Sequence, residues 1–184
     1  MVQFDGLCLA RLKVGIISVG RAGTALGVAL ERTDHVVVCS TASPALRQRV
    51  QHRLPETTQA LPAEVTANTE LLLLSVSDSE LAGLVSGLVV TSAVLLGTIV
   101  AHTAGANGVG ILAALSKDSC IPLAIHSAIT FIGSEEDLSR LPDTRFGITA
   151  ADDIGCVIDQ SLVLGWVESC YVFARTPAFS TTPF

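Results

Sequence analysis

Aromatic and positively charged residues are scarce in this sequence of 184 residues. Aromatic side chains make up 4% of the chain, and 11 Lys and Arg residues stand against 17 Asp and Glu residues, for a net charge of −6. A nucleic-acid partner requires cations for its phosphates or aromatic surfaces for its bases, and no segment gathers either. We therefore expect no binding to nucleic acid.

Paired cysteines are also lacking. The five cysteines are scattered and none forms a CxxC pair, so the sequence predicts neither a disulfide scaffold nor a metal site. The first twelve residues contain Asp5 and lack the charged start and long apolar stretch of a signal peptide. These features favour a cytoplasmic protein with reduced, buried cysteines.

Charge is absent altogether from residues 81–116, which contain no Asp, Glu, Lys or Arg. The part at 81–101 has about the length of a membrane span, but glycines and hydroxyl residues interrupt it. It also divides into a helix from about Ser79 to Ser92 and a strand from Thr98 to Thr103. A helix packed on a parallel sheet, followed by a strand buried on both faces, would be equally apolar. We therefore expect no membrane partner.

Short apolar runs alternate with amphipathic segments along most of the chain. The predicted strands are 13–20, 35–39, 71–76, 98–103, 122–126 and 145–149, with another around 168–173. The predicted helices are 22–32, 43–54, 62–69, 79–92, 108–117 and 152–164, and Ser43 and Asp78 are expected to cap two of them. This alternation predicts an α/β fold with a doubly wound parallel sheet, the Rossmann fold. The composition changes after Gly165, so we predict one domain at 12–164 and an atypical tail at 165–184.

The loop after the first predicted strand carries a variant of the GxGxxG fingerprint of dinucleotide-binding domains. It reads Ser18-Val-Gly20-Arg21-Ala22-Gly23, with Ser18 in the first glycine position. Gly20 would let the backbone approach a pyrophosphate, and Gly23 would let the helix pack closely on the sheet. The start of the helix would offer free N–H groups to the phosphates. The alternative is a tight turn that binds nothing.

The end of the second predicted strand lacks the acidic residue with which NAD-binding domains hold the ribose. Hydroxyl groups and an arginine are found there instead: Ser40, Thr41, Ser43 and Arg47. Arginine suits a 2′-phosphate, and Arg21 could reach the same corner. We therefore predict NADP as the cofactor. The alternative is that Arg47, Arg49 and Arg53 form a solvated helix face.

Four segments together resemble a known family. They are VGIISVGRAGTAL at 14–26, LLLSVSDSE at 72–80, HTAG at 102–105 and HSAITF at 126–131. Over residues 12–164 the chain resembles the bacterial Rossmann-like NADP-binding oxidoreductases of the 6-phosphogluconate-dehydrogenase-like superfamily. That superfamily includes pyrroline-5-carboxylate reductase and the deazaflavin-dependent NADP oxidoreductases.

The resemblance implies hydride transfer between NADP(H) and a small carbonyl or imine substrate, with the chemistry supplied by the cofactor. It implies that Val76, Ser77 and Asp78 lie beside the cofactor. It also implies four catalytic candidates in the nicotinamide cleft: His102, Thr103, His126 and Thr130. Each histidine has an alternative role as a structural hydrogen-bonding group at the end of a strand.

The sequence also departs from the pattern of this family. Ser18, Ala104 and Ser127 replace a glycine, a serine and a proline at motif positions. The pattern stops at Leu164, where the family continues into a helical domain that completes the substrate pocket and usually the dimer. We therefore expect a truncated chain with a tendency to dimerise. Its alternative function is a non-catalytic or degenerate nucleotide-binding module.

Overall fold

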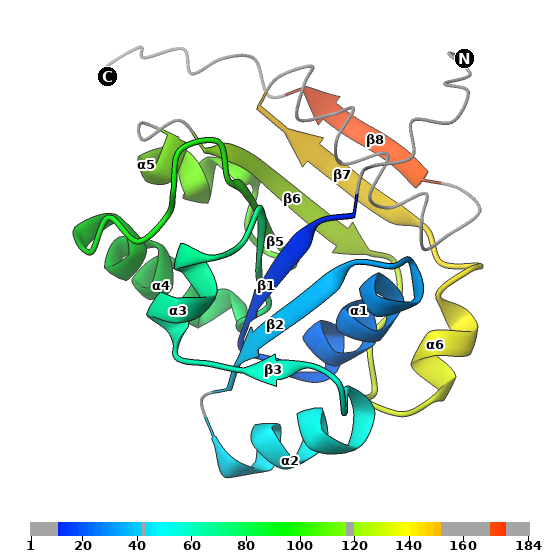
Figure 1. Cartoon of the computed structure of the whole chain (residues 1–184). Helices are drawn as coiled ribbons and strands as arrows, with labels where there is room; N and C mark the ends of the chain where they lie inside the picture. The colour runs from blue at the N-terminus through cyan, green and yellow to red at the C-terminus, as the bar shows by residue number, and fades with distance from the viewer. Residues whose placement is uncertain (1–10, 42, 117–119, 152–169, 176–184) are drawn as a thin grey trace.

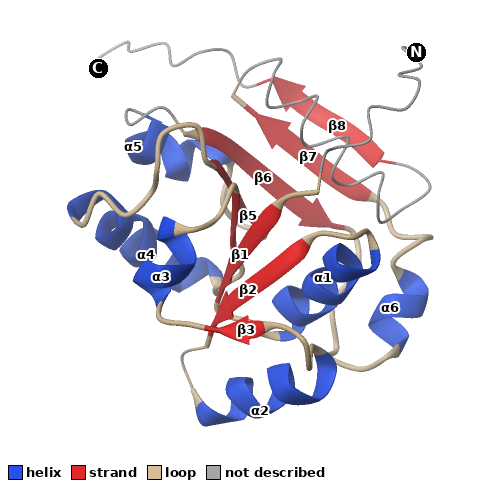
Figure 2. Cartoon of the chain, in the orientation of Figure 1, coloured by secondary structure: helices blue, strands red, loops and turns tan. Residues whose placement is uncertain are grey.

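The computed structural model describes residues 11–41, 43–116, 120–151 and 170–175. Eight strands form one sheet in the order β3-β2-β1-β4-β5-β6-β7-β8 (Figures 1 and 2). The strands are β1 (Lys13–Ile17), β2 (Val36–Ser40), β3 (Thr58–Gln59), β4 (Leu71–Leu74), β5 (Ile99–His102), β6 (Ile121–Ser127), β7 (Phe146–Ala150) and β8 (Cys170–Arg175). The first six run parallel to one another. This order is that of the Rossmann fold, so the predicted fold class is confirmed.

Helices cover both faces of the sheet. They are α1 (Arg21–Arg32), α2 (Pro44–Arg53), α3 (Pro62–Ala67), α4 (Asp78–Val90), the 3-10 helix η1 (Val109–Leu112), α5 (Ala113–Ser116) and α6 (Glu136–Arg140). Apolar residues of α1, α2 and α6 form one core layer, and those of α3, α4, η1 and α5 form the other. In β4, Leu71 and Leu73 face the first layer while Leu72 and Leu74 face the second. Burial on both faces explains why this strand is a continuous apolar run.

Gly15 brings α3 close to the centre of the sheet. A Cβ atom at this position would lie 2.7 Å from Cγ1 of Val65 and 2.8 Å from Cγ2 of Thr69. Val65 lies in α3 and Thr69 just after it, so any side chain larger than hydrogen would push that helix away from β1. The close contact holds the second half of α3 against the middle of β1.

The uncharged segment at 81–101 is divided between two elements, as the sequence predicts. Its first part belongs to α4, and its last part enters β5 at the centre of the sheet. Among the residues that the structure describes, no helix combines the length and the apolar character that a membrane crossing requires.

The structure differs from the prediction in the direction of one strand and in two short elements. The strand predicted at 145–149 is β7, which runs antiparallel to β6 rather than parallel to it. The connection at 128–145 packs α6 against α1 and does not cross back over the sheet, so the chain re-enters the sheet from the same edge. β3 and α6, two and five residues long, were not predicted.

The last described strand, β8, lies beyond the domain boundary predicted after residue 164. β8 lies within the predicted tail and pairs with β7 in the same sheet. It overlaps the strand expected around 168–173 and is shifted by two residues toward the C-terminus. The helix predicted at 152–164 lies outside the described residues. The boundary after residue 164 therefore stays a prediction.

Candidate functional site

The predicted site residues lie at the carboxyl ends of the strands, in the loops that follow them or in the first turn of the next helix, all at one edge of the sheet. The strands β1, β2, β4, β5 and β6 are parallel, so their carboxyl ends meet at this edge. Open α/β sheets bind their ligands there. Two features occupy the edge: a cleft where β2 ends, and a pair of histidines where β5 and β6 end.

The glycine loop joins β1 to α1 in a compact turn. Ser18 has a positive φ of 65°, its N–H donates to the Ser40 carbonyl over 3.1 Å, and its own carbonyl accepts from Gly20 N over 2.9 Å. The Oγ1 of Thr24 closes the first turn of α1 by donating to the Gly20 carbonyl over 2.6 Å. A Cβ atom at Gly20 would meet no atom within 4 Å. The space above Gly20 is therefore open to a ligand.

Gly23 serves packing instead. A Cβ atom there would lie 2.9 Å from Oγ of Ser75 and 3.2 Å from the Ser18 carbonyl. The absence of a side chain lets α1 approach the end of β4. Between the two glycines, Arg21 is exposed and Ala22 is half-buried, so the backbone at the start of α1 is accessible at this edge.

A cleft of about 660 Å³ opens where β2 ends, between α2, α3 and α4. Five of the predicted cofactor-binding residues line it: Ser18, Ser40, Thr41, Arg47 and Val76. The end of β2 contributes no carboxylate. Two carboxylates lie on other walls, those of Glu64 and Glu80. Both accept backbone N–H groups at the starts of α3 and α4, from Leu61 over 2.9 Å and from Ser77 over 3.4 Å.

Other predicted residues do not line the cleft but lie at the starts of the helices that form its walls. Ser43 caps α2 as predicted, since its Oγ accepts from Leu46 N over 3.3 Å. Ser77 caps α4 in a capping box, in which the Glu80 carboxylate accepts from Ser77 N over 3.4 Å; the Ser77 hydroxyl also donates to this carboxylate, over 2.6 Å. The prediction that Asp78 caps α4 is wrong, because Asp78 is the first residue of the helix.

The three arginines of α2 have different surroundings. Arg47 is exposed and lines the cleft. Arg53 is ion-paired with Glu135 over 3.1 Å and its side chain is 15% exposed. Arg49 is half-buried, and its Nη1 is buried without a hydrogen-bond partner among the described residues. The alternative of a uniformly solvated arginine face is therefore wrong for Arg49 and Arg53.

His102, the last residue of β5, is fully buried. Its Nδ1 accepts from Ala104 N over 3.2 Å, so its Nε2 carries the proton and donates to the Gly108 carbonyl over 3.3 Å. Burial lowers the pKa of this imidazole to about 4, although the Gly108 carbonyl acts in the opposite direction. A neutral ring with both nitrogens engaged holds the loop at 103–108 in place. This geometry favours the structural role for His102.

His126, near the end of β6, is only half-buried and differs in its hydrogen bonds. Its ring meets that of His102 edge to face, with centroids 5.8 Å apart. Its Nδ1 is buried and has no hydrogen-bond partner among the described residues. Burial lowers the pKa of His126, while the Asp78 carboxylate acts to raise it. The buried Nδ1 is closed to a bound molecule, but the half-buried ring leaves part of the imidazole accessible. A neutral imidazole at this position can exchange a proton with a bound molecule.

Asp78, the first residue of α4, bonds to the loop that follows β5. Its Oδ1 accepts from Ala106 N over 3.1 Å and from Nδ2 of Asn107 over 3.4 Å. Together with His102, it therefore fixes the loop that follows β5. Thr103 is half-buried within this loop, and Thr130 is exposed beyond β6, so both hydroxyls lie at the carboxyl edge.

Sequence reasoning missed part of the cleft. Gln51, Gln59 and Leu84 line it as well, and Oγ1 of Thr41 donates to Oε1 of Gln59 over 3.3 Å. Gln51 and Gln59 belong to α2 and to the two-residue strand β3, which carry no motif. No local signal in the sequence identifies them.

The strand order, the glycine loop after β1 and the cleft at the end of β2 are those of a Rossmann-like α/β domain. The profile of the Rossmann-like domain family matches residues 3–127. The chain therefore belongs to the Rossmann-like domain family. A search of curated proteins finds no match.

Solved structures with this fold include relatives that the sequence resemblance predicts. A protein of Bacteroides fragilis, provisionally described as an NADP oxidoreductase, has a TM-score of 0.76 at 18% identity, over 90% of this chain and 61% of its own. Pyrroline-5-carboxylate reductase of Streptococcus pyogenes gives 0.65 at 13% identity, over 90% and 59%. The Streptomyces aurantiacus imine reductase gives 0.71 at 13%, over 90% and 56%. The chain thus spans about six tenths of these proteins, and at such identities the likeness shows the fold.

Proposed function

We propose that this chain is the NADP(H)-binding domain of an oxidoreductase that reduces or oxidises a small carbonyl or imine compound. The observation that carries the proposal is the cleft at the end of β2. There Ser40, Thr41 and Arg47 stand where an NAD-binding domain would carry an acid. Hydroxyls and a guanidinium can bind a 2′-phosphate, whereas a carboxylate at the same place would repel it.

The residues present fit a dinucleotide along the carboxyl edge. The adenosine would lie in the cleft with its 2′-phosphate near Arg47. The pyrophosphate would lie over Gly20, where the backbone leaves open space and the start of α1 offers free N–H groups. The nicotinamide end would then extend toward the ends of β5 and β6. When bound, NADP(H) supplies or accepts the hydride.

His126 is the residue best suited to move the accompanying proton. Its Nδ1 has no partner among the described residues. Its ring is only half-buried, so the accessible edge of the neutral imidazole can donate to a carbonyl oxygen or an imine nitrogen. His102 packs edge to face on the ring and is held by its own two backbone hydrogen bonds. His102 would therefore orient His126 without touching the substrate. Thr103 and Thr130, the other two candidates, would donate to the substrate from the same edge.

A titration tests the cofactor assignment directly. Purified protein is titrated with NADPH and with NADH while the nicotinamide fluorescence is recorded. We expect both to bind and NADPH to bind about tenfold more tightly, the effect of about one charge-assisted contact to the 2′-phosphate. Absence of binding by either nucleotide would refute the proposal, and tighter binding of NADH would refute its assignment to NADP.

A second candidate function is a nucleotide-binding module without catalysis. It is favoured by one observation: both ring nitrogens of His102 are already engaged, which leaves His126 as the one histidine of the pair available for proton transfer. NADPH oxidation with a small cyclic imine such as 2-methyl-1-pyrroline separates the two functions. If the chain is catalytic, His126→Asn should lower the rate at least about a hundredfold, within the range of general acid–base catalysis, and leave NADPH binding unchanged. NADPH binding without any turnover would favour the module.

A further inference from the structure

A groove separate from the cofactor cleft lies between α1, α2 and α6. Its volume is about 670 Å³, and none of the residues that line it also lines the cleft at the end of β2. The helix α1 packs against both α2 and α6 and lies between them (Figure 1). The proposed function uses no residue of this groove.

The charged residues that line this groove are separated by sign. The basic ones, Arg32, His52 and Arg53, come from the last turns of α1 and α2. The acidic ones, Glu135 and Glu136, come from the start of α6. The helix dipole favours a positive charge in the last turn of a helix, which accounts for the basic residues but not for the acidic residues beside them. The groove therefore has a basic side, on α1 and α2, and an acidic side, on α6.

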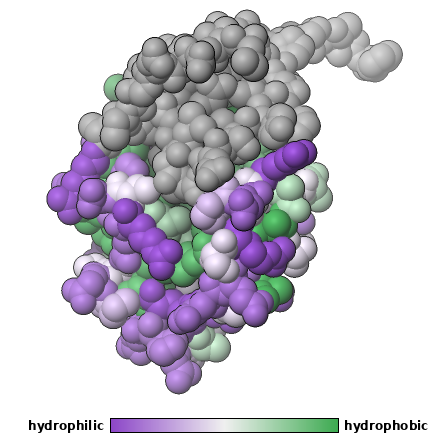
Figure 3. All heavy atoms as spheres, turned by 90° about the vertical axis from the view of Figure 1, so that its right-hand side faces the viewer, coloured by the Kyte–Doolittle hydropathy of each residue, from purple (hydrophilic) through white to green (hydrophobic). Residues whose placement is uncertain are grey.

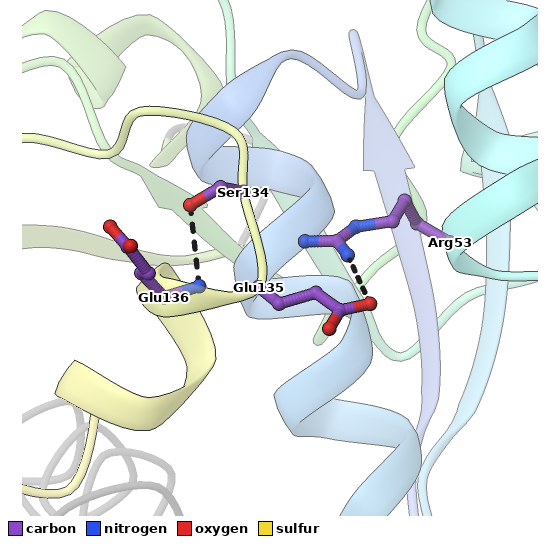
Figure 4. Close-up of polar contacts among 4 residues, drawn as sticks. All are labelled: Arg53, Ser134, Glu135 and Glu136. Atoms are coloured by element: carbon purple, nitrogen blue, oxygen red, sulfur yellow. Dashed lines mark hydrogen bonds and ion pairs between the residues drawn. The ribbon is translucent and has the colours of Figure 1, made fainter.

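One ion pair joins the two sides. Nη1 of Arg53 bonds to Oε1 of Glu135 over 3.1 Å, and the Glu136 carboxylate points away from this pair (Figure 4). Arg32 and Glu136 are both exposed, and neither forms an ion pair within the part of the chain that the structure describes. Each side of the groove therefore keeps one charge that the described chain does not neutralise.

Apolar side chains lie among these charges. Val28 of α1 and Leu138 of α6 line the groove and are half-buried. The face on which the groove opens is mostly hydrophilic where the structure describes it, with apolar surface between the hydrophilic side chains (Figure 3). A partner that fits this groove must cover the apolar surface and offer charges of both signs around it.

We propose that this groove is an interface between two copies of the chain, related by a two-fold axis that runs along the groove. Such an axis places the basic side of each copy opposite the acidic side of the other, so that every favourable contact occurs twice. Arg32 of one copy then faces Glu136 of the other, and the apolar surface of both copies is removed from water. A nucleic acid or another polyanion does not match the groove, because the acidic side would repel it. The inference does not depend on the proposed function.

Sedimentation velocity over a range of protein concentrations tests this interface. The unmodified chain should form a dimer as its concentration rises. Arg32→Glu and Glu136→Arg each place like charges opposite one another and should weaken the dimer at least about tenfold. An equimolar mixture of the two variants should form the dimer again, because one variant carries unpaired acidic side chains on both sides of the groove and the other carries basic ones. Arg140→Glu, at an exposed position of α6 that does not line the groove, is the matched control and should leave the dimer unchanged.

Several outcomes would overturn the inference. A monomer at every concentration would do so, as would an undiminished dimer in both variants or a mixture that fails to associate. An equal loss in Arg140→Glu would show that only the net charge of the chain matters, which also overturns it.

Thermal unfolding of each variant identifies a loss of fold. If a reversed charge unfolds the chain, Arg32→Gln and Glu136→Gln take its place. Each should weaken the dimer about fivefold, because symmetry removes two exposed ion pairs at once, and unchanged association in both would overturn the inference. None of these variants changes a residue of the cofactor cleft, so the results bear on the interface alone and leave the test of the proposed function separate.

Discussion

Where β2 ends, Ser40, Thr41 and Arg47 line an open cleft of about 660 Å³, whereas where β5 ends, His102 is fully buried with both ring nitrogens bonded. The first half of the edge opens onto the cleft and presents the exposed side chain of Arg47 to it. The second half holds its polar groups in internal hydrogen bonds, with Nδ1 of His126 left unused. Both halves lie at the carboxyl ends of parallel strands. They differ in what their polar groups already bind.

This difference assigns recognition of the cofactor to the first half of the edge and proton transfer to the second half. A cofactor can be recognised by groups on mobile, exposed side chains, since each needs only to reach its phosphate or hydroxyl. Proton transfer requires a group held at one position, and here two backbone contacts of His102 and an edge-to-face ring contact provide that support. Substitutions in the first half of the edge should therefore lower cofactor affinity, and substitutions in the second half should lower the rate of proton transfer.

Substitution of Gly20 should have the largest effect, because Gly20 lies where both halves meet. Gly20→Val places a side chain in the space proposed for the pyrophosphate and should abolish binding of NADPH and NADH alike, a loss of at least about a hundredfold. The fold should be retained, because a Cβ at this position meets no atom within 4 Å and its φ of −74° suits any residue. Fluorescence titration and thermal unfolding measure the two effects.

The matched control for this substitution is Gly83→Val. Gly83 lies in α4 and also has open space around its Cβ position, but it is remote from the glycine loop in the sequence and does not line the cleft. Cofactor binding should be unchanged. If Gly20→Val binds normally, the loop is only a turn between β1 and α1.

The sequence predicted the first half of the edge well. Apolar runs such as Leu71–Leu74 identified the central strands, because burial on both faces leaves only apolar residues there. The glycine spacing placed the loop, and Ser43 before Pro44 placed the start of α2. These signals are local, so each can be recognised without knowledge of the rest of the chain.

The second half depends on contacts that no local pattern contains. Whether β7 runs parallel or antiparallel to β6 depends on where the connection between them packs, and α6 is too short for a periodic signal. Asp78 has the residue type of a helix cap, but Ser77 with Glu80 forms the capping box and leaves Asp78 to bind the loop at Ala106. The unpaired nitrogens of Arg49 and His126 also arise only from tertiary packing.

The buried histidine predicts a pH dependence of stability. The pKa of His102 is lowered from an ordinary value of 6.5 to about 4, so between these values the unfolded chain binds a proton that the folded chain does not. The free energy of unfolding should therefore fall as the pH falls from 6.5 to 4, by up to about 3 kcal/mol from this residue. His102→Asn should reduce that loss, as measured by urea unfolding at several pH values.

Two comparisons sharpen this result. His35 and His126 also have lowered pKa values through burial, so part of the pH dependence should persist in the His102 variant. His52→Asn, at an exposed position on α2, should leave the dependence as it is in the unmodified chain. An unchanged slope in His102→Asn would mean that His102 is not held neutral in the folded state.

Arg47→Ala should have a smaller and more selective effect on the first half of the edge. It should weaken NADPH about tenfold, roughly 1.4 kcal/mol, and leave NADH nearly unchanged, since only NADPH carries the 2′-phosphate. Arg32→Ala removes an exposed arginine at the end of α1 and serves as the control for loss of charge. Equal losses for both nucleotides in Arg47→Ala would refute its assignment to the 2′-phosphate.

The smallest effect is expected at Ser18, where the sequence departs from the glycine fingerprint. Ser18 has a φ of 65°, a conformation that costs a residue with a Cβ about 1–2 kcal/mol. Glycine adopts it freely but loses about 0.5–1 kcal/mol more conformational entropy on folding. Ser18→Gly should therefore raise the free energy of unfolding by about 0.5–1 kcal/mol, as measured by urea unfolding. Asp34→Gly, at a turn after α1 with the same φ, should give a similar gain without affecting the cleft. Ser18 also lines the cleft. If Ser18→Gly weakens NADPH binding and Asp34→Gly does not, the Ser18 hydroxyl contacts the cofactor. The serine then contributes to binding at the expense of stability.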